Sequence, residues 1–269
     1  MIIYRNKRVP YGTKLNLCSI LSYFIDIVKH FGLSGRGIIM IDMGGKSSSI
    51  KTKGLVSGEN YHFNLFSLTW IFVLFSVLGF LFEGFWSVIS FGHWDNHYAL
   101  VWGHFTIIYG FAVVGLMLLY PLLGKRRMIT QFLTCFVLGS IFEFSASWLQ
   151  EYVFGTRSWN YYHLPYNLDG RICLRMSLVW GFVGMVFLRL GANRIIKFAR
   201  FFENRMMQKL GFVLFIFMVC NFAVSIMATA RYSERHYGIR ARDNLDLILD
   251  QRFPDERMRH IYYNMEFTK

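Results

Sequence analysis

A nine-residue pattern, G-x-x-F-E-x-x-x-S, occurs twice in the chain, at 79–87 and 139–147. Each copy lies in an apolar run long enough to cross a lipid bilayer, so each brings one carboxyl group, that of Glu83 or Glu143, to membrane depth. An ionisable side chain there is costly unless it faces protein or water, which makes such a pair a pointer to function. At helical spacing the Gly, Glu and Ser of each copy share one stripe, which we expect to face inward.

A third acid extends this stripe. Counted at about 1.5 Å per residue, Glu83 and Glu143 fall in the outer half of the membrane, and Glu151, two turns further along, falls near the outer interface. Together they could line an acidic cavity that opens outward. The alternative is that they serve as hydrogen-bonding groups between helices.

The loop after the second glutamate run supplies further candidate site residues. The planar guanidinium of Arg171 suits an ion pair with either of the last two glutamates, or the capture of an anionic headgroup. Trp159 and Tyr161 are typical of an interfacial aromatic belt, or could grip a lipid or sugar face. Asn167 is a candidate binding residue beside a group of turn-forming residues.

The repeat continues beyond the glutamates, because Tyr109 and Trp180 each begin an aromatic-Gly-Phe triplet in the next apolar run. Both aromatic residues join the candidate site. Two crossings per unit keep both units in the same orientation, which predicts a parallel repeat, with units 65–123 and 129–190, about an axis along the membrane normal. The glutamates would then face each other across that axis.

The elements that position these residues are membrane helices. Hydrophobic residues make up 54% of the chain and charged residues 17%, which excludes an average soluble domain. We predict an all-α polytopic membrane helix bundle with five crossings, the fourth of them short: 65–91, 104–123, 129–152, 175–190 and 210–230.

The flanking regions complete the predicted organisation. Residues 1–62 hold an amphipathic segment, 17–31, expected to lie on the inner membrane surface, followed by a linker. A sixth crossing by this segment is the alternative, although it would bury Asp26 and Lys29. The transmembrane domain spans 63–231, and a charged tail spans 232–269.

The net charge of +13 reflects topology rather than nucleic-acid binding. Residues 1–62 hold nine Lys or Arg, the connection 124–128 holds three and 189–209 holds six, whereas 91–103 holds none. The positive-inside rule then places the N-terminus in the cytoplasm and the loops after both glutamate helices outside. A fifth crossing puts the tail outside as well.

Other chemistry is weakly supported. The four cysteines share no oxidising compartment, so no structural disulfide is expected. Gly44–Ser47 is similar to part of a phosphate-binding loop but lacks its first glycine, so we expect no ATPase in this chain. His93 and His97 lack the further ligands that a metal site needs, and we expect no metal or cofactor.

The second half of the chain resembles a bacterial family labelled putative ABC-transporter permease, type IV. Its approximate pattern, E-x7-E, W-D-Y, P-F-N-L-x-G-R-I-C-L and W-G, is matched by Glu143, Glu151, Trp159–Tyr161, Pro165–Leu174 and Trp180–Gly181. The first half of the family is similar to 79–110, so the resemblance covers 65 to about 190. Two prolines of the family are missing from 103–110, and Asn160 replaces its aspartate.

This resemblance implies a multi-pass protein of the bacterial plasma membrane, with a transport role and a separate ATPase. The basic segment Asn193–Lys209 is the cytoplasmic connection long enough to dock one. Two other functions stay open: a membrane enzyme acting on a lipid or envelope precursor, with Glu143 or Glu151 as base and Arg171 as phosphate anchor, and a scaffold for other membrane proteins. A homo-oligomer also stays open. The residues do not specify the substrate.

Overall fold

The computed structural model describes residues 49–52 and 61–268, all within one unit, Met40–Lys269. The amphipathic segment expected at 17–31 lies outside the described residues. The helices are α2 (Leu65–Phe91), α3 (Ile107–Leu123), α4 (Met128–Phe154), α5 (Leu174–Val186), α6 (Ala192–Ala199), α7 (Arg205–His236), α8 (Asn244–Arg252) and α9 (Asp255–Ile261). A π-helical turn, η1 (Phe187–Gly191), joins α5 to α6, and a 3-10 turn, η2 (Arg200–Glu203), follows α6.

Short antiparallel strand pairs accompany the helices. In the part expected as linker, β1 (Ser49–Thr52) pairs with β2 (Tyr61–Asn64), and the Asn64 side chain then caps α2 by accepting a hydrogen bond from the Ser67 backbone N–H. The other pairs are β3 (Thr156–Arg157) with β6 (Glu266–Phe267), and β4 (Asn167–Leu168) with β5 (Ile172–Cys173).

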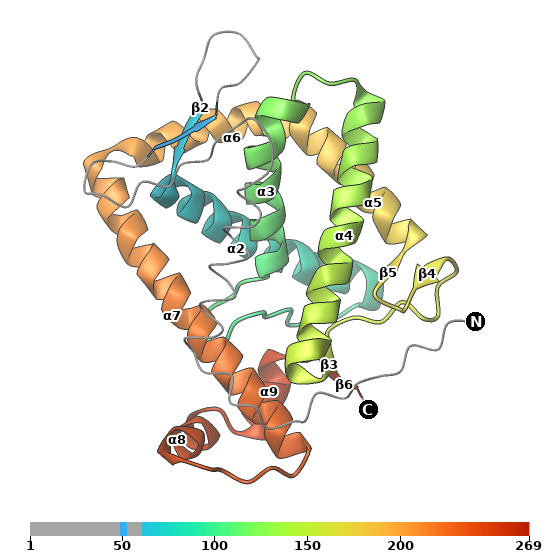
Figure 1. The fold of residues 1–269 in the computed structure, drawn as a ribbon, viewed down its shortest axis with the longest axis vertical. Coiled ribbons are helices and arrows are strands. Elements are labelled where there is room, and N and C mark those ends of the chain that lie inside the picture. Colours follow the sequence, from blue (N-terminus) through green and yellow to red (C-terminus); the bar gives the residue numbers. More distant parts are fainter. Residues whose placement is uncertain (1–48, 53–60, 269) are drawn as a thin grey trace. The chain divides into compact units, whose positions relative to one another are not determined.

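Four helical segments are long and apolar enough to cross a membrane: Leu65–Phe91, Met128–Phe154, Leu174–Glu203 and Arg205–His236. A shorter apolar helix, α3, lies between the first two. The described part of the chain is therefore a multi-pass membrane protein (Figure 1). We expected the fourth crossing, 175–190, to be short, but the short helix is α3. The segment that starts at Leu174 is long because η1 and α6 continue it to Glu203.

The shortness of α3 has a cause in α7. Residues ahead of α3 do not continue the helix but form a loop in which the Ala99 N–H bonds the Phe105 carbonyl. The buried Asn221 side chain of α7 accepts from the Trp102 N–H at 3.3 Å and donates to the Trp102 carbonyl at 2.7 Å. Ser225 accepts from the Val101 N–H at 2.9 Å. These bonds replace those that a helix would have supplied, which lets irregular backbone exist inside a membrane protein.

The helices pack mainly in pairs, α2 with α3 and α4 with α5 (Figure 1), while the first part of α7 contacts the first part of α2. One buried apolar cluster joins α2, α3, η1 and α6 through Ile71, Met117, Leu188 and Ala192. We call the end of the helices that carries 124–127 and η2 the basic end. The opposite end, with 92–106, 155–173 and 237–268, is called the glutamate end.

The tail folds back onto the glutamate end. A second buried cluster joins Ala228 and Tyr232 of α7 to Met258 of α9. The guanidinium of Arg231, which is buried, makes a bidentate pair with Asp250 of α8 at 2.9 and 3.0 Å. The last strand, β6, then pairs with β3 directly after α4. The tail is thus an ordered part of this end of the molecule.

Candidate functional site

Glu83, on α2, lies in a small network of polar side chains. Its Oε1 accepts a hydrogen bond from the Tyr109 hydroxyl at 3.0 Å, and its Oε2 lies 3.2 Å from His97 Nδ1. The other ring nitrogen of His97 lies 3.2 Å from the buried Ser87 hydroxyl, one turn beyond Glu83. The Glu83 side chain keeps 28% of its surface exposed. One aromatic residue of the next helix and one histidine of the loop therefore hold this carboxylate.

Glu143, on α4, has a matching environment that is more closed. Its Oε1 accepts from the Tyr161 hydroxyl at 2.8 Å and its Oε2 from the Trp180 indole N–H at 2.6 Å. Only 3% of the residue is exposed. Again the first aromatic residue of the next helix and one residue of the preceding loop hold the carboxylate.

The two helix pairs touch at matching positions. A Cβ on Gly79 would lie 2.3 Å from the Tyr109 ring, and a Cβ on Gly139 would lie 2.5 Å from Cβ of Trp180. The glycine after each aromatic residue makes a second close contact: Gly110 approaches α2 at residues 72 and 76, and Gly181 approaches α4 at residues 132 and 136. In both copies these positions stand seven and three residues before the glycine of the repeated pattern. Small residues allow this close approach of membrane helices.

The charges of the two clusters reach each other. Burial is the largest cause that raises the pKa of Tyr161, in the loop, and the charge and hydrogen bond of Glu143 add to it. The charge of Glu83 raises the same pKa further. Both glutamates therefore contribute to the pKa of one loop residue, with Glu143 the larger of the two contributions.

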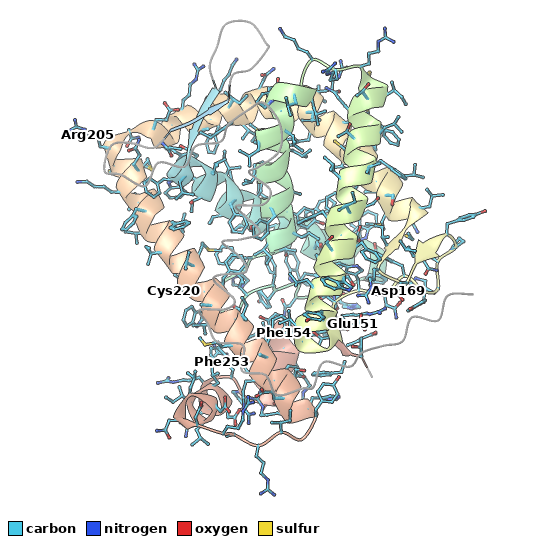
Figure 2. The ribbon with its side chains drawn as sticks, viewed as in Figure 1. Glu151, Phe154, Asp169, Arg205, Cys220 and Phe253 are labelled. Atoms are coloured by element: carbon cyan, nitrogen blue, oxygen red, sulfur yellow. The ribbon has the colours of Figure 1, made fainter. Side chains whose placement is uncertain are left out.

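Glu151 belongs to a different environment, a set of four charged residues at the end of α4. Its Oε2 lies 2.6 Å from Nε of Arg157 and 2.6 Å from Nη2 of Arg171. Asp169 completes the set through Nε of Arg171 at 2.7 Å. Figure 2 labels the two acids, Glu151 near the end of α4 and Asp169 in the loop that follows. Burial alone would raise the pKa of Asp169, but hydrogen bonds from Tyr162 and Arg171 together with both guanidinium charges lower it. The set has no net formal charge.

The remaining predicted residues build the loop around this set. The side chain of Asn167 donates to the Leu164 carbonyl at 2.8 Å and accepts from the Gly170 N–H at 3.1 Å, so it holds a bend. Gly170 has φ 63°, which favours glycine. The Trp159 indole donates to the Arg171 carbonyl at 2.9 Å.

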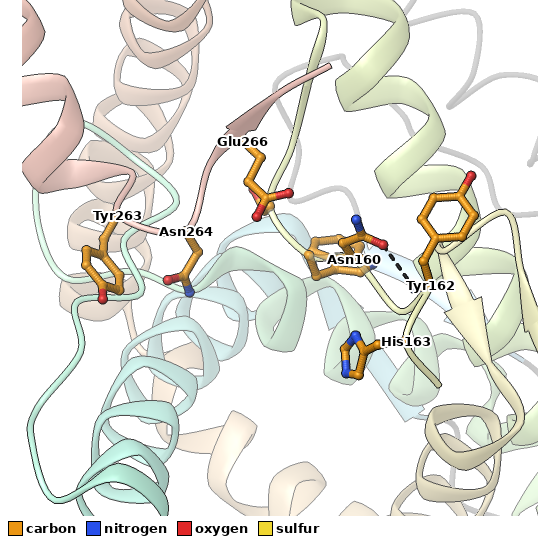
Figure 3. Close-up of a pocket in the computed structure, with 8 residues that line it drawn as sticks. Asn160, Tyr162, His163, Tyr263, Asn264 and Glu266 are labelled. Carbon is orange, nitrogen blue, oxygen red and sulfur yellow. Dashed lines mark hydrogen bonds between the residues drawn. The ribbon is translucent and has the colours of Figure 1, made fainter. Parts of the chain in front are cut away.

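An open groove of about 690 Å³ lies at the glutamate end, between this loop and the tail (Figure 3). Its lining residues are Ser158, Trp159, Asn160, Tyr162, His163, Tyr263, Asn264 and Glu266. Of the predicted site residues, Trp159 is part of this lining, whereas the glutamates of the repeated pattern are not.

Two residues of the Glu83 network were not predicted as site residues. His97 contacts Glu83, and Asn264 of the tail lies 2.9 Å from His97 Nδ1. The repeat gave no signal for His97, because it stands 14 residues after Glu83 whereas Tyr161 stands 18 residues after Glu143. Asn264 had no signal either, because tail docking is a tertiary event. His93 pairs with Asp95 at 3.2 Å, and the described residues contain no group of three metal-ligating side chains.

The apolar helices and the paired carboxylates define a multi-pass membrane protein with polar groups held inside. The family described as putative ABC-transporter type IV matches residues 70–226, more than half of the chain. The chain belongs to this family, and with its apolar helices it is a membrane protein related to transport. No curated protein and no solved structure matches it.

Proposed function

We propose that the protein is the membrane-spanning component of a transport system, and that Glu83 and Glu143 bind the cationic group of its substrate. The observation that carries this proposal is the state of Glu143. Its carboxylate is almost fully buried, and no Lys, Arg or His within the described residues lies at ion-pair distance from it. A buried charge without a partner is costly, so this position favours a cation supplied by a ligand.

The three acids differ in a way that supports these roles. Glu151 is compensated by two arginines, which is a structural arrangement. Glu83 is held by His97 and the Tyr109 hydroxyl, and Glu143 has only neutral donors. A carboxylate offers about four lone-pair sites, so two at Glu143 stay free for a ligand. An enzyme that uses Arg171 to anchor phosphate is less well supported, because two of its nitrogens bind carboxylates.

We further propose that α2–α3 and α4–α5 are a parallel repeat, and that the acidic cavity lies between its two glutamates. The matched glycine contacts, and the matching hydrogen bonds from Tyr109 to Glu83 and from Trp180 to Glu143, support this arrangement. The cavity would face outward in a bacterial plasma membrane, since the connections 124–128 and 189–209 are rich in Lys and Arg whereas 91–103 holds none.

A compound-retention experiment tests the proposed role of the glutamates. Mass spectrometry would compare the small molecules retained by the purified protein, by a Glu83→Gln, Glu143→Gln double variant and by Glu203→Gln, which changes an exposed glutamate. Glutamine mimics a protonated carboxyl group and removes only the charge. We expect cationic compounds to be retained by the native protein and Glu203→Gln, and lost from the double variant. Identical retention in all three would contradict the proposal.

The family suggests a separate ATPase, for which we propose the exposed face of α6 as the docking site. Ile196, Ala199 and Phe202 face the core, whereas Lys197 and Phe198 are exposed. Deleting the segment would therefore damage the fold. A Lys197→Glu, Phe198→Ala variant should lose a co-purifying P-loop ATPase, while Arg127→Glu, at another exposed basic residue, should keep it. Isolation of the native protein without any ATPase would argue against this partner.

A further inference from the structure

Two buried polar atoms beside α4 have no hydrogen-bond partner within the described part of the chain. They are Nη1 of Arg171, whose side chain is 8% exposed, and the hydroxyl of Ser147, which is 1% exposed. Buried donors without partners are rare, because their loss of hydration is not compensated. Both lie next to the carboxylates already described.

The two atoms belong to one place on α4. The guanidinium of Arg171 lies 5.8 Å from the Phe144 ring, and its Nη2 lies 2.6 Å from Glu151. Ser147 stands three residues after Phe144 and four before Glu151, which puts it on the same side of the helix as both. The guanidinium therefore lies along the helical turn that carries Ser147.

This turn also adjoins Glu143, four residues before Ser147. Side chains at that spacing have Cβ atoms about 5–6 Å apart. The loop covers both ends, since Tyr161 donates to Glu143 and Trp159 donates to the Arg171 carbonyl. An uncompensated carboxylate, a hydroxyl and a guanidinium N–H thus follow one another along a buried stripe.

We infer that Ser147 and Arg171 form the second half of the substrate site begun by Glu143, and that the substrate class is a small amine with a hydroxyl group about three carbons from its nitrogen. This inference rests on the proposed function. The ammonium group would pair with Glu143. The hydroxyl would accept a hydrogen bond from Nη1 of Arg171 and donate one to Ser147, which satisfies both orphaned atoms.

The charges favour a hydroxyl over a carboxylate at the second position. The charge of Arg171 is already balanced, because Arg157 and Arg171 form ion pairs with the two carboxylates of Glu151 and Asp169. A further buried carboxylate would lack its own counter-charge, which is unfavourable. A neutral oxygen can accept the free N–H without adding charge, so an amino alcohol should bind better than an amino acid of equal length.

Calorimetric titration of the full-length protein in lipid nanodiscs tests this inference with three probes: 3-amino-1-propanol, propylamine and β-alanine. We expect the amino alcohol to bind about tenfold more tightly than propylamine, equivalent to about 1.4 kcal/mol, and β-alanine to bind more weakly than the amino alcohol. Ser147→Ala should remove most of the preference for the amino alcohol. Ser67→Ala, which deletes another buried hydroxyl without a described partner, should leave it unchanged.

The outcomes separate this inference from the proposed function. Propylamine binding that needs Glu143 but shows no preference for the amino alcohol would overturn the inference and leave the proposed function standing. Binding that is equal in the native protein and Glu143→Gln would overturn both. A preference that survives Ser147→Ala, or no binding of any probe, also overturns the inference. Unchanged thermal unfolding of Ser147→Ala would confirm that the variant is folded.

Discussion

The glutamates of α4 differ in whether a positively charged side chain lies next to them. Glu151 touches two guanidinium groups, so its charge is balanced within the fold. Glu143 touches a phenol and an indole, which donate hydrogen bonds but carry no charge. The same residue type on one face of one helix therefore has opposite expected effects on stability and on ligand binding.

Replacing Glu151 with glutamine should destabilise the protein more than replacing Glu143. The first change leaves two arginines facing a neutral amide, and loss of a hydrogen bond to a charged group costs about 2 kcal/mol. The second change removes a buried charge that has no cation beside it. Thermal unfolding of both variants in nanodiscs would measure the difference. An equal loss of stability would contradict the assignment of a structural role to Glu151 alone.

The internal repeat in the sequence identified four side chains that form two hydrogen-bonded pairs, Glu83 with Tyr109 and Glu143 with Trp180. Their role in binding stays a prediction. The loop partners could not be found in the same way, because the second loop is longer than the first and the repeat does not extend through it. His97 and Tyr161 therefore reach equivalent carboxylates from positions that sequence comparison of the halves does not align.

Helices are held in pairs by glycines, so a methyl group at a contact position should separate them. Gly139→Ala would place Cβ 2.5 Å from Cβ of Trp180, an atom next to the α5 backbone that moves little. We expect a loss of about 1–3 kcal/mol from overpacking. Gly115→Ala in α3 meets no atom within 4 Å and should be neutral or slightly stabilising.

Thermal unfolding of these two alanine variants, with ligand-free protein, checks the prediction. Gly79→Ala should lose stability as well, since its Cβ would lie 2.3 Å from the Tyr109 ring and 2.8 Å from Cβ of Tyr109. Equal stability of Gly139→Ala and Gly115→Ala would show that the α4–α5 contact is looser than described.

The apolar segments were visible from hydropathy alone, because a bilayer imposes length and composition on any helix that crosses it. Their ends were not. The start of α3 depends on Asn221 and Ser225, which lie more than a hundred residues away and capture the backbone ahead of the helix. A local property such as hydropathy carries no information on such a contact.

At the scale of the whole molecule, ion pairs attach the tail to α7, and acid should release it. Burial alone would raise the pKa of Asp250, but hydrogen bonds from Arg231 and Arg235 and their charges lower it. A carboxyl group with a lowered folded-state pKa stabilises the fold above its ordinary pKa, about 3.9, and loses this contribution as the pH falls through the lowered value. Docking should therefore be complete at neutral pH and weaken below about pH 4.

A spin label on α8 would report this release. At Ile248→Cys, with the exposed Cys220 replaced by serine, the label should be immobile at neutral pH and become mobile on acidification. Asp250→Asn should mobilise it already at neutral pH, whereas Glu256→Gln should not. A label that stays immobile in the Asp250→Asn variant would show that apolar contacts alone hold the tail.

Topology can be tested on intact cells with a membrane-impermeant thiol reagent. If the glutamate end is external, Tyr263→Cys in the tail should react and Arg127→Cys at the basic end should react only after lysis. The native exposed Cys220 is replaced in both variants. The reverse labelling pattern would invert the orientation and turn the acidic cavity toward the cytoplasm.

Because the loop at 99–105 depends on α7, the early helices cannot reach their final membrane structure before α7 has been synthesised. While the ribosome is still making the early helices, the backbone groups of Val101 and Trp102 have no Asn221 or Ser225 to meet. Hydrocarbon offers them no substitute. The first hairpin should thus wait at the insertion machinery or in an aqueous vestibule until the final span emerges. A chain truncated before α7 should be retained there and degraded instead of settling in lipid.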